Sequence, residues 1–260
     1  TFTYAAAVVG RYWVGGTGNW DATTTHWSTT SGGASGASVP ISTDNVFFDS
    51  LSSATAYTVT ITATANTADL TIGAPLAGAV TWAGSSALNI FGNLNLSGGT
   101  AGITRTYTGA ITFSATTTGK TVTFNGVTMA SNTTFNGVGG GWTLQDTWNN
   151  GTAGTSITLT NGTLNTNGKT VTSSIFNGSG STTRTLTLGA STINLASSSN
   201  AWNFTTTTGL TFNANTSTIS ITGGGISFLG GGLTYNNLTI SGINAFSTWD
   251  ITGANTFNNF

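Results

Sequence analysis

Residues 57–62 read Y-T-V-T-I-T, and this stretch decides the fold class of the chain. Apolar Val59 and Ile61 alternate with Thr58, Thr60 and Thr62, which is the two-residue period of a strand with one buried face. Three further pairs follow the same alternation and are expected to point inward: Ile157 with Leu159, Leu186 with Leu188, and Ile219 with Ile221. The sequence therefore predicts an all-β protein whose outward faces carry Thr, Ser and Asn.

Similar runs recur along the chain and indicate a repeat architecture. Residues 119–123, G-K-T-V-T, return at 168–172, and residues 209–213, G-L-T-F-N, return as G-L-T-Y-N at 232–236. Periods of about 20–50 residues are typical of solenoids and propellers. Several Asn-Gly pairs are compatible with β-hairpins and so with a propeller, but the irregular spacing between the strands favours a solenoid. At about 20 residues per coil, we expect a right-handed parallel β-helix of about ten coils.

The charge content agrees with stacked coils and excludes several classes of protein. The 260 residues include five Lys or Arg, six acidic residues, all Asp, and no Cys. In a parallel β-helix each coil lies about 4.8 Å from the next, so like side chains stack and like charges are penalised. A nucleic-acid interface needs a basic surface, and a membrane span needs about 18 consecutive apolar residues. We expect neither, and the missing cysteines exclude disulfides.

The first 50 residues differ in composition from the rest. They hold Trp13, Trp20 and Trp27, the single His26 and the Pro40 loop. We expect two domains: residues 1–50 as a Trp/Gly-rich cap or a segment connecting subunits, and residues 51–260 as the β-solenoid.

Candidate catalytic and metal-binding groups are few. His26 has Asp21 nearby but no G-x-S-x-G elbow, and we interpret it as an exposed or packing histidine. Asp44 and Asp49 could supply a carboxylate pair or calcium ligands, but such residues more often cap turns. The sequence thus predicts no enzyme activity, no cofactor and no required metal. The acidic residues are Asp21, Asp44, Asp49, Asp69, Asp146 and Asp250.

The aromatic residues are expected mainly in the core, because most alternate in phase with aliphatic residues. An exposed aromatic row could instead bind sugar rings. The residues concerned are Trp142, Trp148, Trp202, Trp249, Phe113, Phe124, Phe135, Phe204, Phe212 and Phe228.

Residues 12–49 contain W-V-G-G-T-G-N-W, then H-W-S, then V-P-I-S-T-D-N-V-F-F-D. This pattern resembles the opening segment of bacterial secreted β-strand-repeat proteins, which include autotransporter-associated repeat adhesins and related phage-encoded fibre proteins. His26 stands where Asn is common in that pattern. The resemblance implies a secreted parallel β-helix with a structural or adhesive role, and it supplies no active site. The matching residues are Trp13, Gly15, Gly16, Gly18, Trp20, Trp27, Val39, Pro40, Asp44, Val46 and Phe48.

Both termini are apolar, and a solenoid exposes unpaired strand edges. We therefore expect head-to-tail assembly into an extracellular filament or fibrous adhesin, with a second copy as the partner. One alternative is a phage tail fibre or surface adhesin domain that binds host glycans, and a third is a polysaccharide depolymerase. A longer adhesin could also supply the missing coils. The candidate interface residues are Phe2, Tyr4, Val8, Val9, Tyr12, Trp13, Trp249, Phe257 and Phe260.

Overall fold

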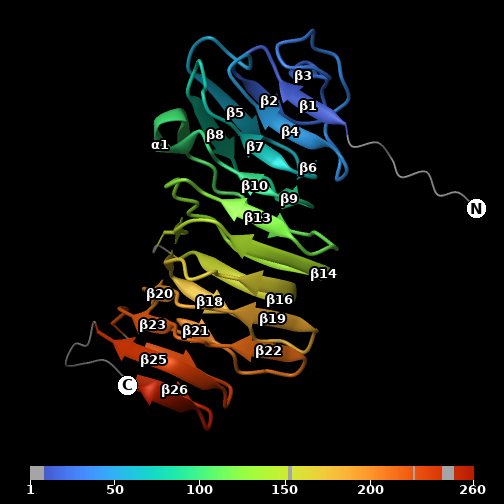
Figure 1. Ribbon diagram of the computed structural model, residues 1–260. Helices are drawn as coiled ribbons and strands as arrows, with labels where there is room; N and C mark the ends of the chain where they lie inside the picture. The colour runs from blue at the N-terminus through green and yellow to red at the C-terminus, as the bar shows by residue number, and fades with distance from the viewer. Residues whose placement is uncertain (1–8, 152–153, 225, 242–248) are drawn as a thin grey trace, which may run out of the picture. The chain divides into compact units, whose positions relative to one another are not determined.

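The computed structural model describes residues 9–151, 154–224, 226–241 and 249–260. The chain forms two compact units, Thr1–Ile111 with Thr123–Val127, and Thr112–Val122 with Thr128–Phe260. Both are parallel β-solenoids in which each coil hydrogen-bonds to the next (Figure 1). The predicted fold class is confirmed, with about nine turns over the described residues where about ten were expected.

The first unit stacks its strands in three parallel series and contains one short helix. The series are β2–β5–β8–β11, β1–β4–β7–β10 and β6–β9, with β3 added to β1. The elements are β1 Gly10–Trp13, β2 Gly18–Trp20, β3 Trp27–Ser28, β4 Asn45–Phe48, β5 Tyr57–Ile61, β6 Ala65–Thr67, β7 Leu70–Ile72, β8 Val80–Gly84, β9 Leu88–Ile90, β10 Leu94–Asn95, α1 Gly99–Gly102 and β11 Ile103–Arg105.

Two strands, β12 Ile111–Phe113 and β13 Lys120–Thr123, contain residues of both units. The strands of the second unit are β14 Thr133–Leu144, β15 Trp148–Asn149, β16 Ser156–Asn165, β17 Val171–Ser173, β18 Ile175–Asn177, β19 Arg184–Thr187, β20 Thr192–Leu195, β21 Trp202–Asn203, β22 Leu210–Asn213, β23 Thr218–Ile221, β24 Ile226–Leu229, β25 Thr234–Ile240, β26 Trp249–Thr252 and β27 Thr256–Asn259.

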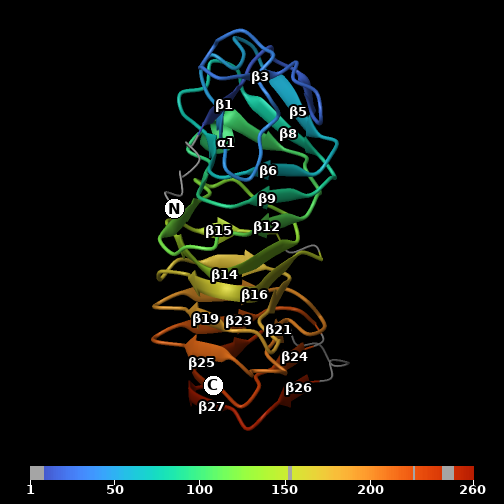
Figure 2. The ribbon, with the colours of Figure 1, turned by 90° about the vertical axis from the view of Figure 1, so that its right-hand side faces the viewer.

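Three parallel stacks make up the described part of the second unit. The long strands β14 and β16 each bend through a corner and so belong to two stacks. Their second halves continue into β19 and β22, as Figure 2 shows for β14, β16 and β19. Their first halves continue through β18, β21 and β24 to β26, while β15, β17, β20, β23, β25 and β27 form the third stack.

The inward positions are those that the alternation predicts. Val59 and Ile61 are buried, as are the other three predicted pairs. The aromatic core is likewise confirmed for the described side chains, except that Phe212 is only half-buried. Phe113 and Phe135 stack with ring centroids 4.8 Å apart. Such ring pairs contribute about 0.5–1.5 kcal/mol beyond the area that they bury.

Polar side chains also stack between coils, as the sequence predicts. Four Asn amides donate to the Asn one coil earlier: Asn89 to Asn66, Asn161 to Asn136, Asn258 to Asn236 and Asn259 to Asn237. The coils themselves differ in length, because 22 residues separate Leu164 from its neighbour Leu186, whereas 19 separate Ile219 from Leu238. Since 26 separate Leu186 from Phe212, most of these coils exceed 20 residues, and fewer turns fit into the chain.

Candidate functional site: the strand edges and a lateral groove

The first strand of the first unit is covered on its outer side. The two-residue strand β3 pairs antiparallel with β1, with Trp13 opposite Trp27. The rings of Trp13 and Trp27 meet edge to face at 5.1 Å, and Trp20 approaches Trp27 at the same distance. All three indoles are buried. Short strands protect a sheet edge against pairing with other chains, and β3 protects β1 in this way at Tyr12 and Trp13.

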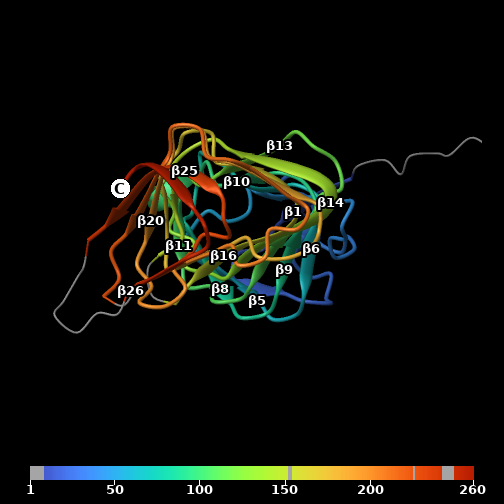
Figure 3. The same ribbon diagram turned by 90° about the horizontal axis from the view of Figure 1, so that it is seen from below.

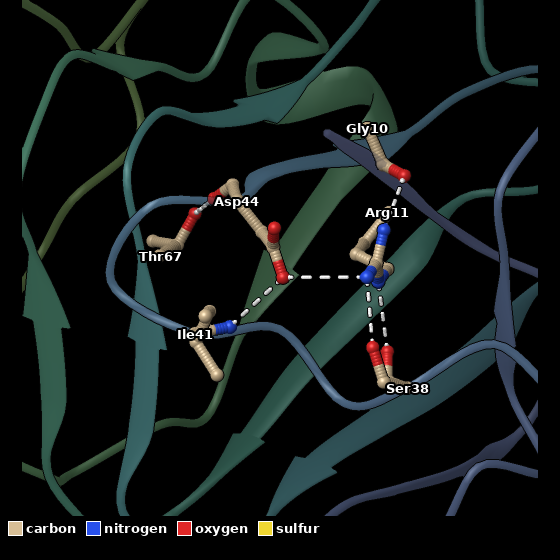
Figure 4. A network of polar contacts seen from close by, with 6 residues as sticks. All are labelled: Gly10, Arg11, Ser38, Ile41, Asp44 and Thr67. Atoms are coloured by element: carbon tan, nitrogen blue, oxygen red, sulfur yellow. Dashed lines mark hydrogen bonds and ion pairs between the residues drawn. The ribbon is translucent and has the colours of Figure 1, made fainter. Parts of the chain in front are cut away.

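A latch formed by Arg11 and Asp44 closes the loop that follows β3 (Figure 4). Arg11 donates through Nε to the carbonyl of Ser38 and through Nη2 to the Ser38 hydroxyl, at 2.9 and 2.7 Å. Arg11 Nη2 lies 3.6 Å from Asp44 Oδ2, which also accepts the Ile41 N–H. The carbonyl of Asp44 accepts the Thr67 hydroxyl at 3.1 Å. Asp44, the aspartate of the sequence motif, therefore fastens the loop of residues 29–44, which we call the cap loop, to β1 and to the second coil.

The strands β26 and β27 end their stacks in the second unit, which Figure 3 views from the side of β25 and β26. Within the described residues, β26 pairs only with β24 and β27 only with β25. Phe257 continues the aromatic stack of the core, with its ring 5.6 Å from Tyr235. Phe260 follows and is 73% exposed, beside a groove of about 280 Å³ lined also by Leu238 and Ile240. An apolar strand edge is thus available here.

A second groove lies on the side of the second unit and measures about 680 Å³. One wall is residues 137–140, an outward bulge of β14 that carries the 77% exposed Val138. The opposite wall is the loop 181–183 before β19, and the floor is residues 161–163 of the coil between them. Residues 137–140 form the corner of β14, whereas a single residue, Gly162 with φ +83°, forms the corresponding corner of β16. A Cβ there would lie 2.6 Å from the Gly137 carbonyl, so the floor requires glycine.

Arg184 fixes the loop wall of this groove from inside. Its side chain is 1% exposed and donates only to main-chain carbonyls in the described structure. Nε reaches Gly178 at 2.7 Å, Nη1 reaches Thr182 and Thr208, and Nη2 reaches Thr206 at 2.8 Å. Burial lowers the pKa of the guanidinium. The cation is therefore a structural tie between two coils, with its donors turned to main-chain carbonyls.

The predicted interface residues fall into several environments. Phe257 and Phe260 lie at the open edge of the second unit, as described above. Val9 is 37% exposed, and Tyr12 is half-buried against Phe47 at 4.8 Å. Trp13 has no exposed surface, because the rings of His26, Trp27 and Phe48 pack against it, so its side chain is unavailable to a partner.

The remaining interface candidates cannot be assigned a side-chain environment. Phe2, Tyr4 and Val8 lie outside the described residues. Trp249 pairs through its backbone with Ile226, and its side chain is likewise outside the description.

The candidate catalytic groups have local structural roles. His26 stacks flat on Trp13 at 4.7 Å, and its Nδ1 lies 2.9 Å from the Val14 carbonyl, which agrees with a packing histidine. Asp21 accepts the N–H and the hydroxyl of Thr23, and these bonds lower its pKa. Asp49 accepts the Leu51 N–H. The predicted turn-capping role is thus confirmed for Asp49, and Asp21 has the same role.

Sequence reasoning missed the features that depend on coil-to-coil contact. Leu238 and Ile240 read as ordinary strand residues, and Arg184 reads as the start of a strand. The four glycines and valine of residues 137–141 were the one available signal for the bulge. Among the described residues, no group of three or more His, Cys, Asp or Glu is arranged to hold a metal ion. The described part of the chain contains no helix long and apolar enough to span a membrane.

Comparisons of the chain with protein-family models, with curated proteins and with solved structures found no match.

Proposed function

We propose that this chain is a non-enzymatic extracellular structural protein that assembles head to tail through the open edge of β26 and β27. The observation that carries the proposal is that, among the described residues, β26 pairs only with β24 and β27 only with β25, while exposed Phe260 and partly exposed Phe257 continue the aromatic stack of the core. Edge strands with free N–H and C=O groups accept further strands. A contact between different surfaces of identical chains produces an open filament.

The chemistry of the edge suits another coil of the same kind. The Asn258 and Asn259 amides already donate to the preceding coil, which leaves an Asn ladder in position to continue. The strands β26 and β27 together carry one charged side chain, Asp250. Because uncharged ladders meet no Coulomb repulsion when they stack, a partner coil rich in Asn, Thr and aromatic residues is compatible with this edge.

The partner segment that we assign is residues 1–8 of a second copy. In that segment Phe2 and Tyr4 alternate with Thr1 and Thr3, which is the strand period. The edge of β1 is covered by β3 at Tyr12 and Trp13, so we propose the segment before β1 as the part of the N-terminal region that pairs with another chain. Strand addition of this kind uses main-chain hydrogen bonds for affinity and alternate side chains for specificity.

The experiment is negative-stain electron microscopy together with sedimentation velocity over a range of protein concentrations. Wild-type protein should form filaments or a concentration-dependent series of oligomers. The Phe260→Lys variant places a charge at the edge and should remain monomeric, since a lysine on a strand edge opposes pairing. The matched control is Leu51→Lys, which changes another exposed apolar residue, in the first unit, and should leave assembly intact.

Deletion of residues 1–8 separates the two parts of the proposal. If the deletion variant is monomeric, the donor segment is supported. If it assembles like wild type while Phe260→Lys does not, the edge is an interface but residues 1–8 are not its partner. Monomeric wild-type protein at every concentration would refute the assembly role.

A second candidate function is the binding of a neutral glycan in the lateral groove, and the groove's lining favours it. Its walls and floor carry hydroxyl and amide groups, including Asn161 and Thr163, and the one cation, Arg184, is buried. A glycan array probed with wild-type protein and with Val138→Asp tests this role. Binding that is lost in Val138→Asp supports it, and no bound glycan on the array argues against it.

A further inference from the structure

The chain contains six Asn-Gly pairs, a dipeptide in which the asparagine side chain can lose its amide without an enzyme. The main-chain nitrogen of the following residue attacks the side-chain carbon Cγ, and glycine leaves this nitrogen unshielded because it has no Cβ. The attack requires an N–H that is not held in a hydrogen bond and an asparagine side chain that can turn toward it. The pairs begin at Asn125, Asn136, Asn150, Asn161, Asn167 and Asn177.

Two of these pairs lie at the centre of tight turns, residues 124–127 and residues 166–169. In each turn the N–H of the fourth residue donates to the carbonyl of the first, at 3.0 and 2.9 Å. The Asn and the Gly have φ values of +47° and +80° in the first turn, and of +53° and +69° in the second. Two successive positive φ values are typical of a type I′ turn. The glycine N–H takes no part in the hydrogen bond that closes such a turn.

The reacting groups of both turns are open to water. Gly126 and Gly168 are exposed, and within the described ranges of the chain neither N–H donates to another group. The side chains of Asn125 and Asn167 are exposed as well. Water and base therefore reach the attacking nitrogen and the amide that it attacks.

The other four pairs are held by hydrogen bonds. The N–H groups of Gly151, Gly162 and Gly178 each donate to an acceptor, at 2.9, 3.3 and 2.9 Å. Asn136 lies within β14, and its Oδ1 accepts the side-chain amide of Asn161 one coil later. At these pairs the attack would first have to break a hydrogen bond of the folded chain, so the fold protects them.

We propose that Asn125 and Asn167 are sites of spontaneous deamidation, with water as the co-reactant. The glycine nitrogen forms a bond to Cγ and gives up its proton. The bond from Cγ to Nδ2 breaks, and the departing NH₂ group takes up that proton and leaves as ammonia. Water then opens the succinimide ring at either of its carbonyl carbons, which produces aspartate or isoaspartate. No group is oxidised or reduced, and a neutral side chain becomes an anionic one.

The reaction removes a contact between coils at both turns. Asn125 Nδ2 donates to the Ser97 carbonyl at 3.1 Å, and Asn167 Nδ2 donates to the Leu144 carbonyl at 3.0 Å. An ionised carboxylate only accepts hydrogen bonds, so after the reaction it meets the carbonyl oxygen as a second acceptor. Isoaspartate also adds a methylene group to the main chain of the turn. Each event therefore loosens the turn from the preceding coil.

Peptide mapping by mass spectrometry tests the assignment. The folded protein is kept at mildly alkaline pH, sampled over time and digested with pepsin in acid, which stops the reaction. Pepsin is preferred to trypsin because residues 121–169, which contain five of the six pairs, form one tryptic peptide. Positions 125 and 167 should accumulate aspartate and isoaspartate several-fold faster than the other four. Protein unfolded in urea should react at all six pairs at similar rates.

Two results of this mapping would overturn the proposal. One is an intact amide at both positions of the folded protein after the unfolded protein has reacted. The other is a folded protein in which the four held pairs react as fast as Asn125 and Asn167. The proposed assembly through β26 and β27 does not enter this test, since none of the six pairs lies on those strands.

Two aspartate variants test the effect on the coils. Asn167→Asp is one product of the reaction and should unfold at a lower temperature than wild type, because the Nδ2 donor is lost. The matched control is Asn215→Asp, since Asn215 is also exposed, with φ +50°, but accepts the Gly189 N–H through Oδ1 at 3.1 Å. Aspartate keeps that oxygen, so the control should unfold like wild type. An Asn167→Asp variant as stable as Asn215→Asp would overturn the proposed loosening.

Discussion

Replacing Arg184 by Met should destabilise the second unit by about 3–5 kcal/mol, the part of its hydrogen-bond energy that remains after the desolvation of the cation and the rehydration of the exposed carbonyls. The guanidinium donates four hydrogen bonds of 2.7 to 2.9 Å to carbonyls of residues 178, 182, 206 and 208. At about 1.5–3 kcal/mol per charge-assisted bond, the bonds alone would exceed this figure. The desolvation of the cation offsets part of the gain.

The substitution keeps the side-chain volume and removes every donor. The carbonyl of Gly178 lies in the buried part of the site, whereas Thr182, Thr206 and Thr208 are exposed residues whose carbonyls can turn to water. This partial rehydration brings the expected loss below the sum of the four bonds. Arg184→Lys should fall between wild type and Arg184→Met, because an ammonium cannot reproduce the planar fork of donors.

Hydrogen exchange followed by mass spectrometry is the appropriate assay, since repeat proteins need not unfold in one step. The informative amides are Gly180, bonded to the Thr206 carbonyl, and Arg184 itself, bonded to Gly209. Their protection should fall in Arg184→Met. The control is Lys169→Met, which removes a cation that is not surrounded by main-chain carbonyls in this way. It should change protection by less than about 0.5 kcal/mol. A loss below about 1 kcal/mol in Arg184→Met, the range of a surface ion pair, would refute the reasoning.

Asp44→Ala should release the cap loop and destabilise the first unit by about 2–4 kcal/mol, because the partly buried Arg11 cation loses its counter-ion and the Ile41 N–H loses its acceptor; tryptophan fluorescence during urea unfolding measures this. Burial raises the pKa of Tyr107 and of Tyr235 above the usual value near 10. The folded state then keeps protons that the unfolded state loses, so stability is complete below about pH 10 and falls as the pH rises above it. The urea midpoint should be lower at pH 11 than at pH 9. The difference should be smaller in the variant that carries both Tyr107→Phe and Tyr235→Phe. Gly162→Ala should cost about 1–3 kcal/mol, since it combines a positive φ with a Cβ clash; a melting temperature equal to that of wild type would contradict this.

The alternation in the sequence was sufficient to predict the fold class and the inward face of each strand. Val59, Leu186 and Ile219 point inward because a strand with one wet face has only one register that buries its apolar side chains. The stacking of Asn on Asn followed from the scarcity of charge. These are local properties, and each can be deduced from the few residues around it.

The candidate sites were predicted less completely. Phe257 lies on β27 and Phe260 follows it, and β27 pairs only with β25 among the described residues; their role in assembly stays a prediction. Trp13 was assigned to the same kind of surface, but the antiparallel strand β3 covers it. No local pattern predicts that a two-residue strand will fold back in the direction opposite to all the others.

The sequence alone determined that this chain is a stack of strands with few charges, because periodicity and charge act within a coil. Only the tertiary structure decided which residues of successive coils meet. Since the coils compared here vary from 19 to 26 residues, the distance along the chain does not predict that Thr163, Thr185 and Thr211 share a column, or that Arg184 reaches Thr206 and Thr208. Register between coils is set by the packing of buried side chains across many turns and by the lengths of the loops between them. Both depend on contacts between residues far apart in the sequence.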